Sequence, residues 1–325
     1  MLKKRLFLAI KILVFLAVCL WVSKELYKSW DKIQGIHWEP NYFLLVLSGL
    51  CYIVAYIPAA IYWRYVMKTL GQKPGRYETF RAYYIGHLGK YVPGKAMVMI
   101  IRTGLLNHER TKISTAAAGV FVETLTMMAV GAFVAALTIL LRFQHIEHSQ
   151  WLTLLALGTM VCTILPILPP VFHFATKKLK KFQIELKELR FRTLAVGWML
   201  NVPVWMMLGF SLWLTILGFG MESKSFFTEL SYCTLAISGA IVLGFASMLP
   251  GGFVARELVL VYFLGLFFAT HPVGDFEPEG LAIVIAAVYR IISILAELFV
   301  SAMLAVFSKR KRSQLHQTEV IPGAV

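Results

Sequence analysis

The sequence predicts an all-α protein that crosses a membrane several times. Its 325 residues are 58% hydrophobic and have a mean hydropathy of +0.71, which is more apolar than an ordinary soluble domain. A helix needs about 20 mostly apolar residues to cross the hydrocarbon core of a bilayer. The sequence contains six long apolar segments, at residues 6–22, 42–66, 114–141, 151–174, 193–218 and 281–306.

Two further apolar regions, 80–101 and 229–269, are interrupted by Pro-Gly. Proline removes a backbone donor and clashes with the preceding turn, and glycine weakens the helix further. A broken helix is tolerated in a bilayer only where its backbone is buried in protein or lines a wet cavity. We therefore expect six full spans and two broken re-entrant regions, or eight helices in all. The residues that make the breaks are Gly86, Gly89, Pro93, Gly94, Pro250, Gly251 and Gly252.

The charges of the loops predict the orientation. If region 80–101 is a hairpin and the N-terminus is cytoplasmic, the inside loops carry 21 Lys and Arg and the outside loops carry 5. This distribution satisfies the positive-inside rule. A single crossing at 80–101 would place the basic loop 175–192 outside, so we reject it. Region 229–269 then makes either a hairpin or two spans, because the acidic loop from His271 to Glu279 must lie outside.

The order and orientation of the predicted spans and hairpins indicate an inverted repeat. The order of span, hairpin and span around region 80–101 recurs around region 229–269, and the two hairpins enter from opposite sides. Many secondary transporters have this architecture, with the binding site near the midplane. We expect one transmembrane domain over residues 1–308 and a basic, disordered cytoplasmic tail over 309–325.

Several classes of function are disfavoured by composition and motifs. The formal net charge of +15 is accounted for by the inside loops, so we expect no nucleic-acid partner. The sequence has no GxxxxGK[ST] and no HExxH run, so we expect no cofactor and no metal. Its cysteines lie in apolar segments without a CxxC, which is typical of small buried hydrophobic residues. They are Cys19, Cys51, Cys162 and Cys233.

Seven charged residues lie at membrane depth, where each costs at least ~2.5–3.5 kcal/mol unless it is paired or faces a cavity. They are Lys90, Lys95, Glu123, Arg256, Glu257, Arg290 and Glu297. Glu123 and Arg290 are each nine residues into their spans, roughly 13 Å deep at 1.5 Å per residue. Two interpretations stay open and are compatible: an ion pair that locks the two halves, or a polar pathway that these groups line. Glu297 follows Arg290 on the same helix face.

Lys95 and Arg256 each follow a helix break. A helix N-terminus offers free N–H groups and a positive dipole end, which favour an anion. We therefore predict a lipid-headgroup site made by Lys90, Lys95, Arg102 and Arg256, with Glu123, Glu257, Arg290 and Glu297 as a polar pathway or gate. The alternative is that these cations merely neutralise their neighbours, as Arg256 beside Glu257 suggests.

These residues together resemble a known family. The features are the run from Gly86 to Lys95, Arg102 after it, Glu123, Leu-Pro-Gly-Gly252 with Arg256-Glu257, and Arg290. They are similar to the transmembrane region of the lysylphosphatidylglycerol synthase/flippase proteins, over residues 5–308. The resemblance implies an inner-membrane protein that handles a lipid between leaflets, either an aminoacylated phospholipid, a polyprenyl-linked sugar or a hopanoid-type lipid. The synthases add a soluble aminoacyl-transferase domain, for which we expect no room after Ser308.

We therefore predict a flippase-like lipid transporter, not an enzyme, in the plasma (inner) membrane with both termini cytoplasmic. Its expected partners are membrane lipids, mainly anionic, with a second copy of the chain or a lipid-modifying enzyme as further candidates. Two alternatives stay open: a membrane enzyme acting on a lipid phosphate, and a non-transporting scaffold for a glycosyltransferase or lipid synthase. An enzyme would need a nucleophile or a metal set at membrane depth, and we identify none in the sequence.

Overall fold

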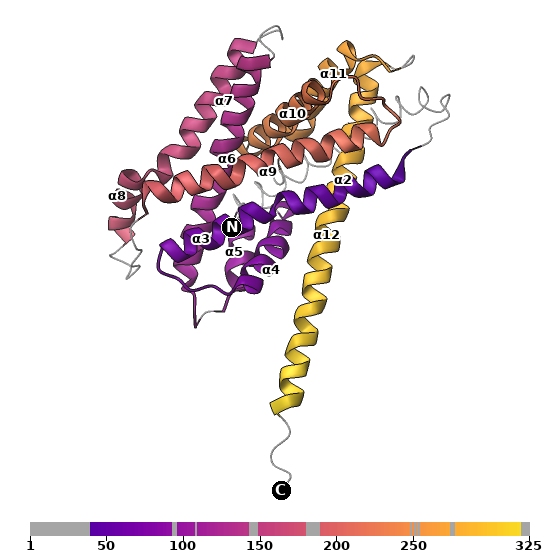
Figure 1. Cartoon of the computed structure of the whole chain (residues 1–325). Helices are drawn as coiled ribbons and strands as arrows, with labels where there is room; N and C mark the ends of the chain where they lie inside the picture. Colours follow the sequence, from indigo (N-terminus) through magenta and orange to yellow (C-terminus); the bar gives the residue numbers. More distant parts are fainter. Residues whose placement is uncertain are drawn as a thin grey trace, which may run out of the picture.

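The computed structural model describes residues 40–92, 96–107, 109–142, 149–179, 189–247, 249, 252, 254–273 and 277–319. This part of the chain is helical and contains no β-strand. Figure 1 shows the helices packed as one bundle, from which the last helix leads away toward the C-terminus. The first half comprises α2 (Tyr42–Ala55), α3 (Ile57–Thr69), α4 (Arg76–His87), the 3₁₀ helix η1 (Leu88–Tyr91), α5 (Ala96–Gly104) and α6 (Ile113–Arg142). The second half comprises α7 (Ser149–Ile164), η2 (Leu165–Ile167), α8 (Pro169–Leu179), α9 (Phe191–Leu217), α10 (Phe226–Ala246), α11 (Ala255–Thr270) and α12 (Pro278–Glu319).

Six helical stretches are long and apolar enough to cross a membrane. They are Tyr42–Thr69, Ile113–Arg142, Gln150–Ile167, Phe191–Leu217, Phe226–Ala246 and Pro278–Phe307. Five of them correspond to predicted spans, and the predicted span 6–22 lies outside the described residues. The remaining one, α10, has 21 residues, whereas its partner α11 has only 16. The second broken region is therefore one membrane-length helix followed by a shorter one.

The predicted span 42–66 is divided into two helices. Tyr56 separates α2 from α3, and Pro58 occupies the first turn of α3. Proline is favoured in a first turn, where a helix has no use for its missing N–H, but it cannot continue the preceding helix. The two helices still form one candidate span from Tyr42 to Thr69.

Region 80–101 folds as the predicted hairpin. The backbone N–H of Lys73, before α4, donates to the carbonyl of Arg110, after α5, at 3.4 Å. Nearby, the backbone N–H of Lys112 donates to the side chain of Gln72 at 2.7 Å. Both ends of the hairpin α4–η1–α5 therefore lie at the same face of the bundle, and its tip points inward.

Two glycines allow the arms of this hairpin to approach closely. A Cβ atom at Gly86 would lie 2.3 Å from Cγ of Arg102, and one at Gly89 would lie 2.7 Å from the backbone nitrogen of Val98. Real Cβ atoms essentially never come so close to another heavy atom. The glycines predicted to break the helix are therefore also required for packing between α4 and α5.

The second hairpin, α10–α11, enters from the opposite face. Leu217 at the end of α9, Glu229 in the first turn of α10 and His271 after α11 line one small cavity of about 150 Å³. The backbone N–H of Asn41 donates to the carbonyl of Gly218 at 2.8 Å, so α2 also begins at this face. The chain therefore passes twice through span, hairpin and span in opposite directions, which is the predicted inverted repeat.

Polar side chains and small residues hold the two halves together. The Ser48 hydroxyl in α2 donates to the carbonyl of Ser211 in α9 at 2.7 Å, and the Ser211 hydroxyl donates back to the carbonyl of Ser48 at 2.8 Å. Trp205 of α9 donates through its indole N–H to the carbonyl of Met127 in α6 at 3.1 Å. Such interhelical hydrogen bonds stabilise membrane bundles, in which the hydrophobic effect contributes little.

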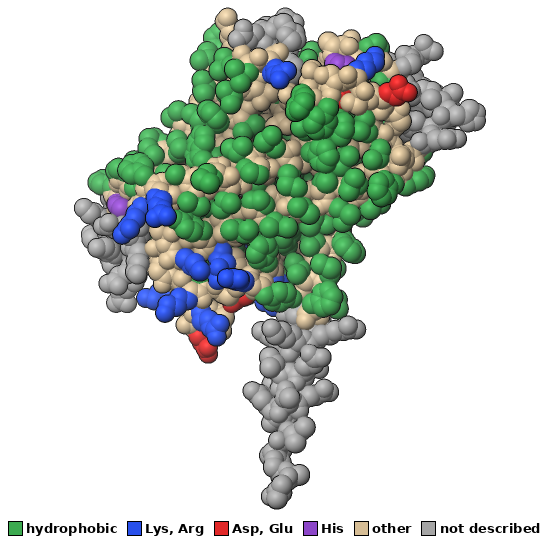
Figure 2. Space-filling view, in the orientation of Figure 1, with side chains coloured by type: hydrophobic (Ala, Val, Ile, Leu, Met, Phe, Trp, Pro, Cys, Tyr) green, Lys and Arg blue, Asp and Glu red, His purple; other side chains and the backbone are tan. Residues whose placement is uncertain are grey.

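Charge is unequally distributed between the two ends of the bundle. Figure 2 shows a band of hydrophobic side chains, with Lys and Arg gathered mainly below it and a few above it. At the face where both ends of the hairpin α4–η1–α5 lie, the exposed basic residues are Lys68, Lys73, Arg76, Arg110, Lys112, Arg190 and Arg192. At the opposite face, Arg142 and Lys224 are exposed. This asymmetry is what the loop count predicted.

The last helix is longer than predicted. Its expected end was residue 306, but α12 continues to Glu319. The polar tail that was expected to be disordered therefore begins as a continuation of this helix, and residues 320–325 lie outside the described part.

Candidate functional site

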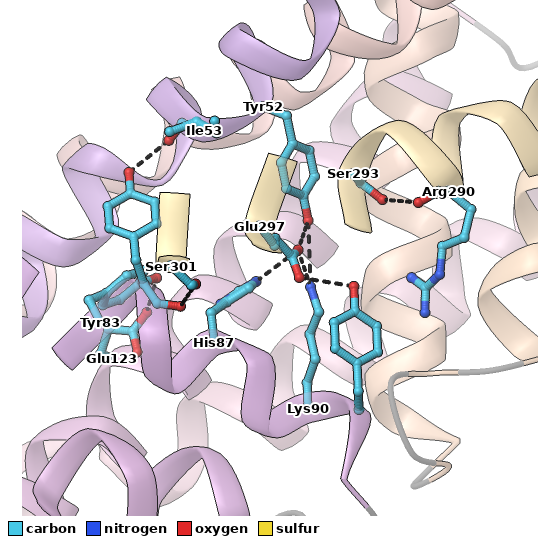
Figure 3. Close-up of polar contacts among 12 residues, drawn as sticks. Tyr52, Ile53, Tyr83, His87, Lys90, Glu123, Arg290, Ser293, Glu297 and Ser301 are labelled. Atoms are coloured by element: carbon cyan, nitrogen blue, oxygen red, sulfur yellow. Dashed lines mark hydrogen bonds and ion pairs between the residues drawn. The ribbon is translucent and has the colours of Figure 1, made fainter. Parts of the chain in front are cut away.

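The described charged residues of the predicted spans gather around the tip of the first hairpin, and Figure 3 shows four of them, Lys90, Glu123, Arg290 and Glu297. The end of α4 and η1 supply His87, Lys90 and Tyr91, and the facing helix α12 supplies Arg290 and Glu297. These groups form three neighbouring clusters, which differ in how completely their charges are satisfied.

The first cluster is a closed ion pair between the hairpin and α6. Nη1 of Arg102 lies 2.7 Å from Oε2 of Glu123, and the two side chains are 3% and 2% exposed. The Tyr83 hydroxyl donates to Oε1 of the same carboxylate at 3.1 Å. The guanidinium of Arg102 also lies 3.9 Å from the centre of the Tyr83 ring. Both charges are therefore neutralised within the protein, and neither can reach a ligand in this conformation.

This arrangement corrects two predictions. Glu123 does not pair with Arg290, whose Nε instead lies 3.6 Å from Oε1 of Glu257. Glu123 meets Arg102 of α5, whereas Arg290 meets Glu257 of α11. Arg102, predicted to hold a lipid headgroup, is instead the partner of Glu123.

The second cluster is built on Glu297, which is 4% exposed. Its Oε1 accepts hydrogen bonds from the Tyr52 hydroxyl and from Nζ of Lys90, the latter at 2.5 Å. Its Oε2 accepts from the Tyr91 hydroxyl at 2.9 Å. Nε2 of His87 lies 3.6 Å from Oε1. One carboxylate of α12 therefore joins α2 and three residues of the hairpin tip.

Aromatic rings connect these two clusters. The Tyr83 ring stacks on His87 with 6.2 Å between centroids, His87 lies 4.6 Å from the Tyr56 ring, and Tyr56 lies 5.3 Å from Tyr52. Because Tyr83 binds Glu123 and Tyr52 binds Glu297, the two buried carboxylates belong to one continuous polar and aromatic layer.

The third cluster contains the residues that follow the second break. Arg256 is only 5% exposed, yet its Nη2 has no hydrogen-bond partner among the described residues. The neighbouring Glu257 uses Oε1 toward Arg290, while its Oε2 likewise lacks a hydrogen bond in this part of the chain. The guanidinium of Arg290 lies 5.5 Å from the centre of the Tyr91 ring, so the third cluster adjoins the second.

Charge in the three clusters does not balance. Lys90, Arg102 and Arg290 each face a carboxylate, from Glu297, Glu123 and Glu257 respectively. Arg256 is an additional buried cation that forms no ion pair within 4 Å among the described residues, and a buried charge without a counter-ion is costly. The third cluster is therefore suited to accept an anion. Within the described residues, no group of three or more His, Cys, Asp or Glu could hold a metal ion.

Arg256 in the second hairpin is positioned in the same way as Arg102 in the first hairpin, by close packing against a glycine of the other arm. A Cβ atom at Gly244 would lie 3.0 Å from Cβ of Arg256 and 3.3 Å from Cα of Gly252. Gly252 adopts a φ of +69°, which an L side chain rarely adopts. In both hairpins, therefore, a glycine of the first arm contacts the arginine of the second arm.

Some of the predicted residues cannot be placed. Lys95, Pro93, Gly94, Pro250 and Gly251 lie outside the described residues.

The tyrosines and the histidine of the site are not among the residues that the sequence predicted for it. A signal was present, because Tyr52 and Tyr56, and likewise Tyr83, His87 and Tyr91, follow one another at intervals of four residues. That spacing places side chains on one face of a helix.

Comparison with known proteins agrees with the sequence resemblance. The family described as the lysylphosphatidylglycerol synthase TM region matches residues 8–301. No curated protein matches the chain. The match extends over both hairpins and ends within α12, at residue 301. The chain therefore belongs to the family of the lysylphosphatidylglycerol synthase transmembrane region.

Proposed function

We propose that this protein is a flippase-like lipid transporter that holds an anionic headgroup between the tips of its two hairpins. The observation that carries the proposal is the buried guanidinium of Arg256, whose Nη2 has no hydrogen-bond partner among the described residues. A cation left in this state favours a ligand that brings a negative charge.

The backbone around Arg256 supports an anion as the ligand. Arg256 is the second residue of α11, and the N-cap residue of this helix, Val254, makes no side-chain capping hydrogen bond. The first N–H groups of a helix have no partner within the helix, and together with the helix dipole they favour negative charge. A phosphate placed here would receive hydrogen bonds from both the backbone and the guanidinium.

The surroundings support a lipid as the source of that anion. The cluster lies within a bundle whose outer surface carries many exposed apolar side chains, including Leu258 and Tyr262 of α11 itself. The side chains of Lys90, Arg290 and Glu257 keep 20%, 11% and 19% exposure. A headgroup could therefore reach these residues while its acyl chains remain in the bilayer.

We favour transport over catalysis on a lipid phosphate. A general base must be free to take a proton from the reacting group. Glu123 and Glu297 are each held by a cation and by tyrosine hydroxyls, so Glu257, whose Oε2 accepts no hydrogen bond within the described residues, is the carboxylate of the site that an enzyme would have to use. We propose the plasma (inner) membrane, with both termini cytoplasmic, as the setting of this activity.

The test is a leaflet-resolved assay on the full chain in liposomes that contain fluorescent phosphatidylglycerol. The parent chain should expose inner-leaflet probe to an external quencher faster than protein-free liposomes do. Arg256→Gln should lose most of this activity, whereas Lys224→Gln, at the exposed far face, should retain it. A parent chain no faster than protein-free liposomes would refute the transport proposal.

A further inference from the structure

We infer that Glu297 is an internal counter-anion that competes with the lipid headgroup for Lys90. This inference rests on the proposed function, because it concerns how the same site is loaded. In the described conformation Glu297 holds Lys90 and thereby fastens the tip of the first hairpin to α12. A phosphate at Arg256 and Arg290 takes Lys90 over, which removes the ion pair between the tip and α12 and leaves the hydrogen bond from Tyr91 to Glu297.

The exposures of the ion-paired side chains single out Lys90. In the pair of Arg102 and Glu123 both side chains are sealed, at 3% and 2% exposure. In the pair of Lys90 and Glu297 the carboxylate is 5% exposed but the lysine is 20% exposed. Lys90 is thus reachable from outside while its partner is covered, so a ligand can take the cation but cannot displace the carboxylate.

The alternative partner of Lys90 lies beside it. The hydroxyl of Tyr91, the next residue, donates to Glu297, and the guanidinium carbon of Arg290 lies 5.5 Å from the centre of the Tyr91 ring. Figure 3 shows Lys90 extending to Glu297, with the side chain of Arg290 to one side of it. An anion bound by Arg290 and Arg256 therefore adjoins the lysine, and an ammonium on a flexible four-carbon stem can change partners by rotating that stem.

Glu297 remains satisfied after such an exchange. The hydroxyls of Tyr52 and Tyr91 continue to donate to its two oxygens, and His87 lies 3.6 Å from Oε1. A carboxylate with these donors is not left as an orphaned buried charge, which would otherwise oppose the release of Lys90. The titratable and charged groups around the carboxylate of Glu297 are Tyr52, Tyr56, His87, Lys90, Tyr91, Arg256 and Arg290.

The ion pair between Lys90 and Glu297 holds a part of the chain that is suited to move. The tip is η1, a 3₁₀ helix of four residues, and short 3₁₀ segments have poorer hydrogen-bond geometry than α-helices. Both arms of the hairpin return to the same face. Loading of the headgroup is thereby coupled to loss of the ion pair that joins the hairpin tip to α12.

The experiment compares lipid binding by the full chain and its variants, using native mass spectrometry with phosphatidylglycerol as the probe. Glu297→Gln removes the competing charge and should bind phosphatidylglycerol about ten- to a hundredfold more tightly, the value of one charge-assisted hydrogen bond. Adding Lys90→Gln to this variant should abolish the gain. No tighter binding in Glu297→Gln, or a gain that persists in the double variant, would overturn the exchange.

A second variant keeps the test decisive if Glu297→Gln does not fold. Tyr52 is 1% exposed and shares Oε1 of Glu297 with Lys90, so it cannot touch a ligand directly. Tyr52→Phe leaves Lys90 as the stronger donor to that oxygen and should weaken binding about two- to tenfold. Unchanged or tighter binding in this variant contradicts the inference.

A parallel titration with inorganic phosphate separates the headgroup from the lipid tails. A gain in Glu297→Gln with inorganic phosphate supports exchange at the phosphate group itself, and a gain confined to phosphatidylglycerol supports exchange with the headgroup held in place by its acyl chains. Failure of the proposed function has a different signature, because the parent chain would then be no faster than protein-free liposomes in the leaflet assay, whatever the binding of phosphatidylglycerol by Glu297→Gln.

Discussion

Arg102 and Glu123 form the most deeply buried ion pair of the described residues, with 2.7 Å between Nη1 and Oε2. The pair joins α5 of the first hairpin to α6. Tyr83 of α4 contacts both residues, because its hydroxyl donates to Glu123 and its ring lies 3.9 Å from the guanidinium of Arg102.

The pair should therefore behave as a coupled unit. Arg102→Met and Glu123→Gln should each reduce the free energy of unfolding by about 3–5 kcal/mol, because each leaves a buried charge without its partner. The double variant should lose much less than the sum. Thermal unfolding in detergent checks this, with Glu123→Gln combined with Arg290→Gln as the control cycle. That control should be additive, and strict additivity of Arg102 with Glu123 would disprove the coupling.

The glycine of the first arm should tolerate no side chain. Gly86→Ala places a Cβ 2.3 Å from Cγ of Arg102, and such overpacking costs about 1–3 kcal/mol. Gly104→Ala is the matched control, because a Cβ there has no neighbour within 4 Å. The measurement is the unfolding midpoint of both variants. Equal midpoints would mean that the arms of the hairpin separate easily.

The inverted repeat predicts the sidedness of the two hairpins. Single cysteines at Asn107, after α5, and at Thr270, at the end of α11, should react with an impermeant thiol reagent from opposite sides of the membrane. The background should lack the four native cysteines. Labelling of both positions from one side would contradict the topology described for the two hairpins.

The headgroup site predicts a graded effect of charge and shape at Arg256. Arg256→Gln should weaken binding of phosphatidylglycerol by about ten- to a hundredfold, and the same holds for Lys95→Gln, whose position the sequence alone predicts. Arg256→Lys should restore only part of the affinity, because a bidentate grip on phosphate needs the guanidinium. Lys224→Gln serves as the control. Native mass spectrometry that finds parent-like affinity in Arg256→Gln would place the headgroup elsewhere.

Sequence patterns were sufficient to predict the orientation of the loops and the positions of the two Pro-Gly breaks. The loop charges distinguished a hairpin from a crossing at 80–101, because orientation in a bilayer is decided by which loops carry Lys and Arg. Pro-Gly located both breaks. The break at Tyr56 was missed, because Pro58 lies in a run that is apolar on both sides.

Partner choice at the site could not be predicted from the sequence. Counting residues along a span gives the depth of Glu123 and Arg290, but it does not give the direction in which each side chain points. Arg102 reaches Glu123 only because Gly86 lets α5 lie against α4. The tyrosine donors around Glu297 come from α2 and η1, so their convergence depends on the packing of distant segments.

The attachment of the first hairpin at one face of the bundle has a mechanical consequence. A helix that spans the membrane cannot shift along its axis without drawing a polar loop through the hydrocarbon. The linkers of the hairpin to α3 and to α6 both lie at one face of the bundle. Its tip can therefore shift or tilt while both neighbouring spans stay in place. The hairpin can therefore change its depth without drawing the charged loops of either neighbouring span across the bilayer.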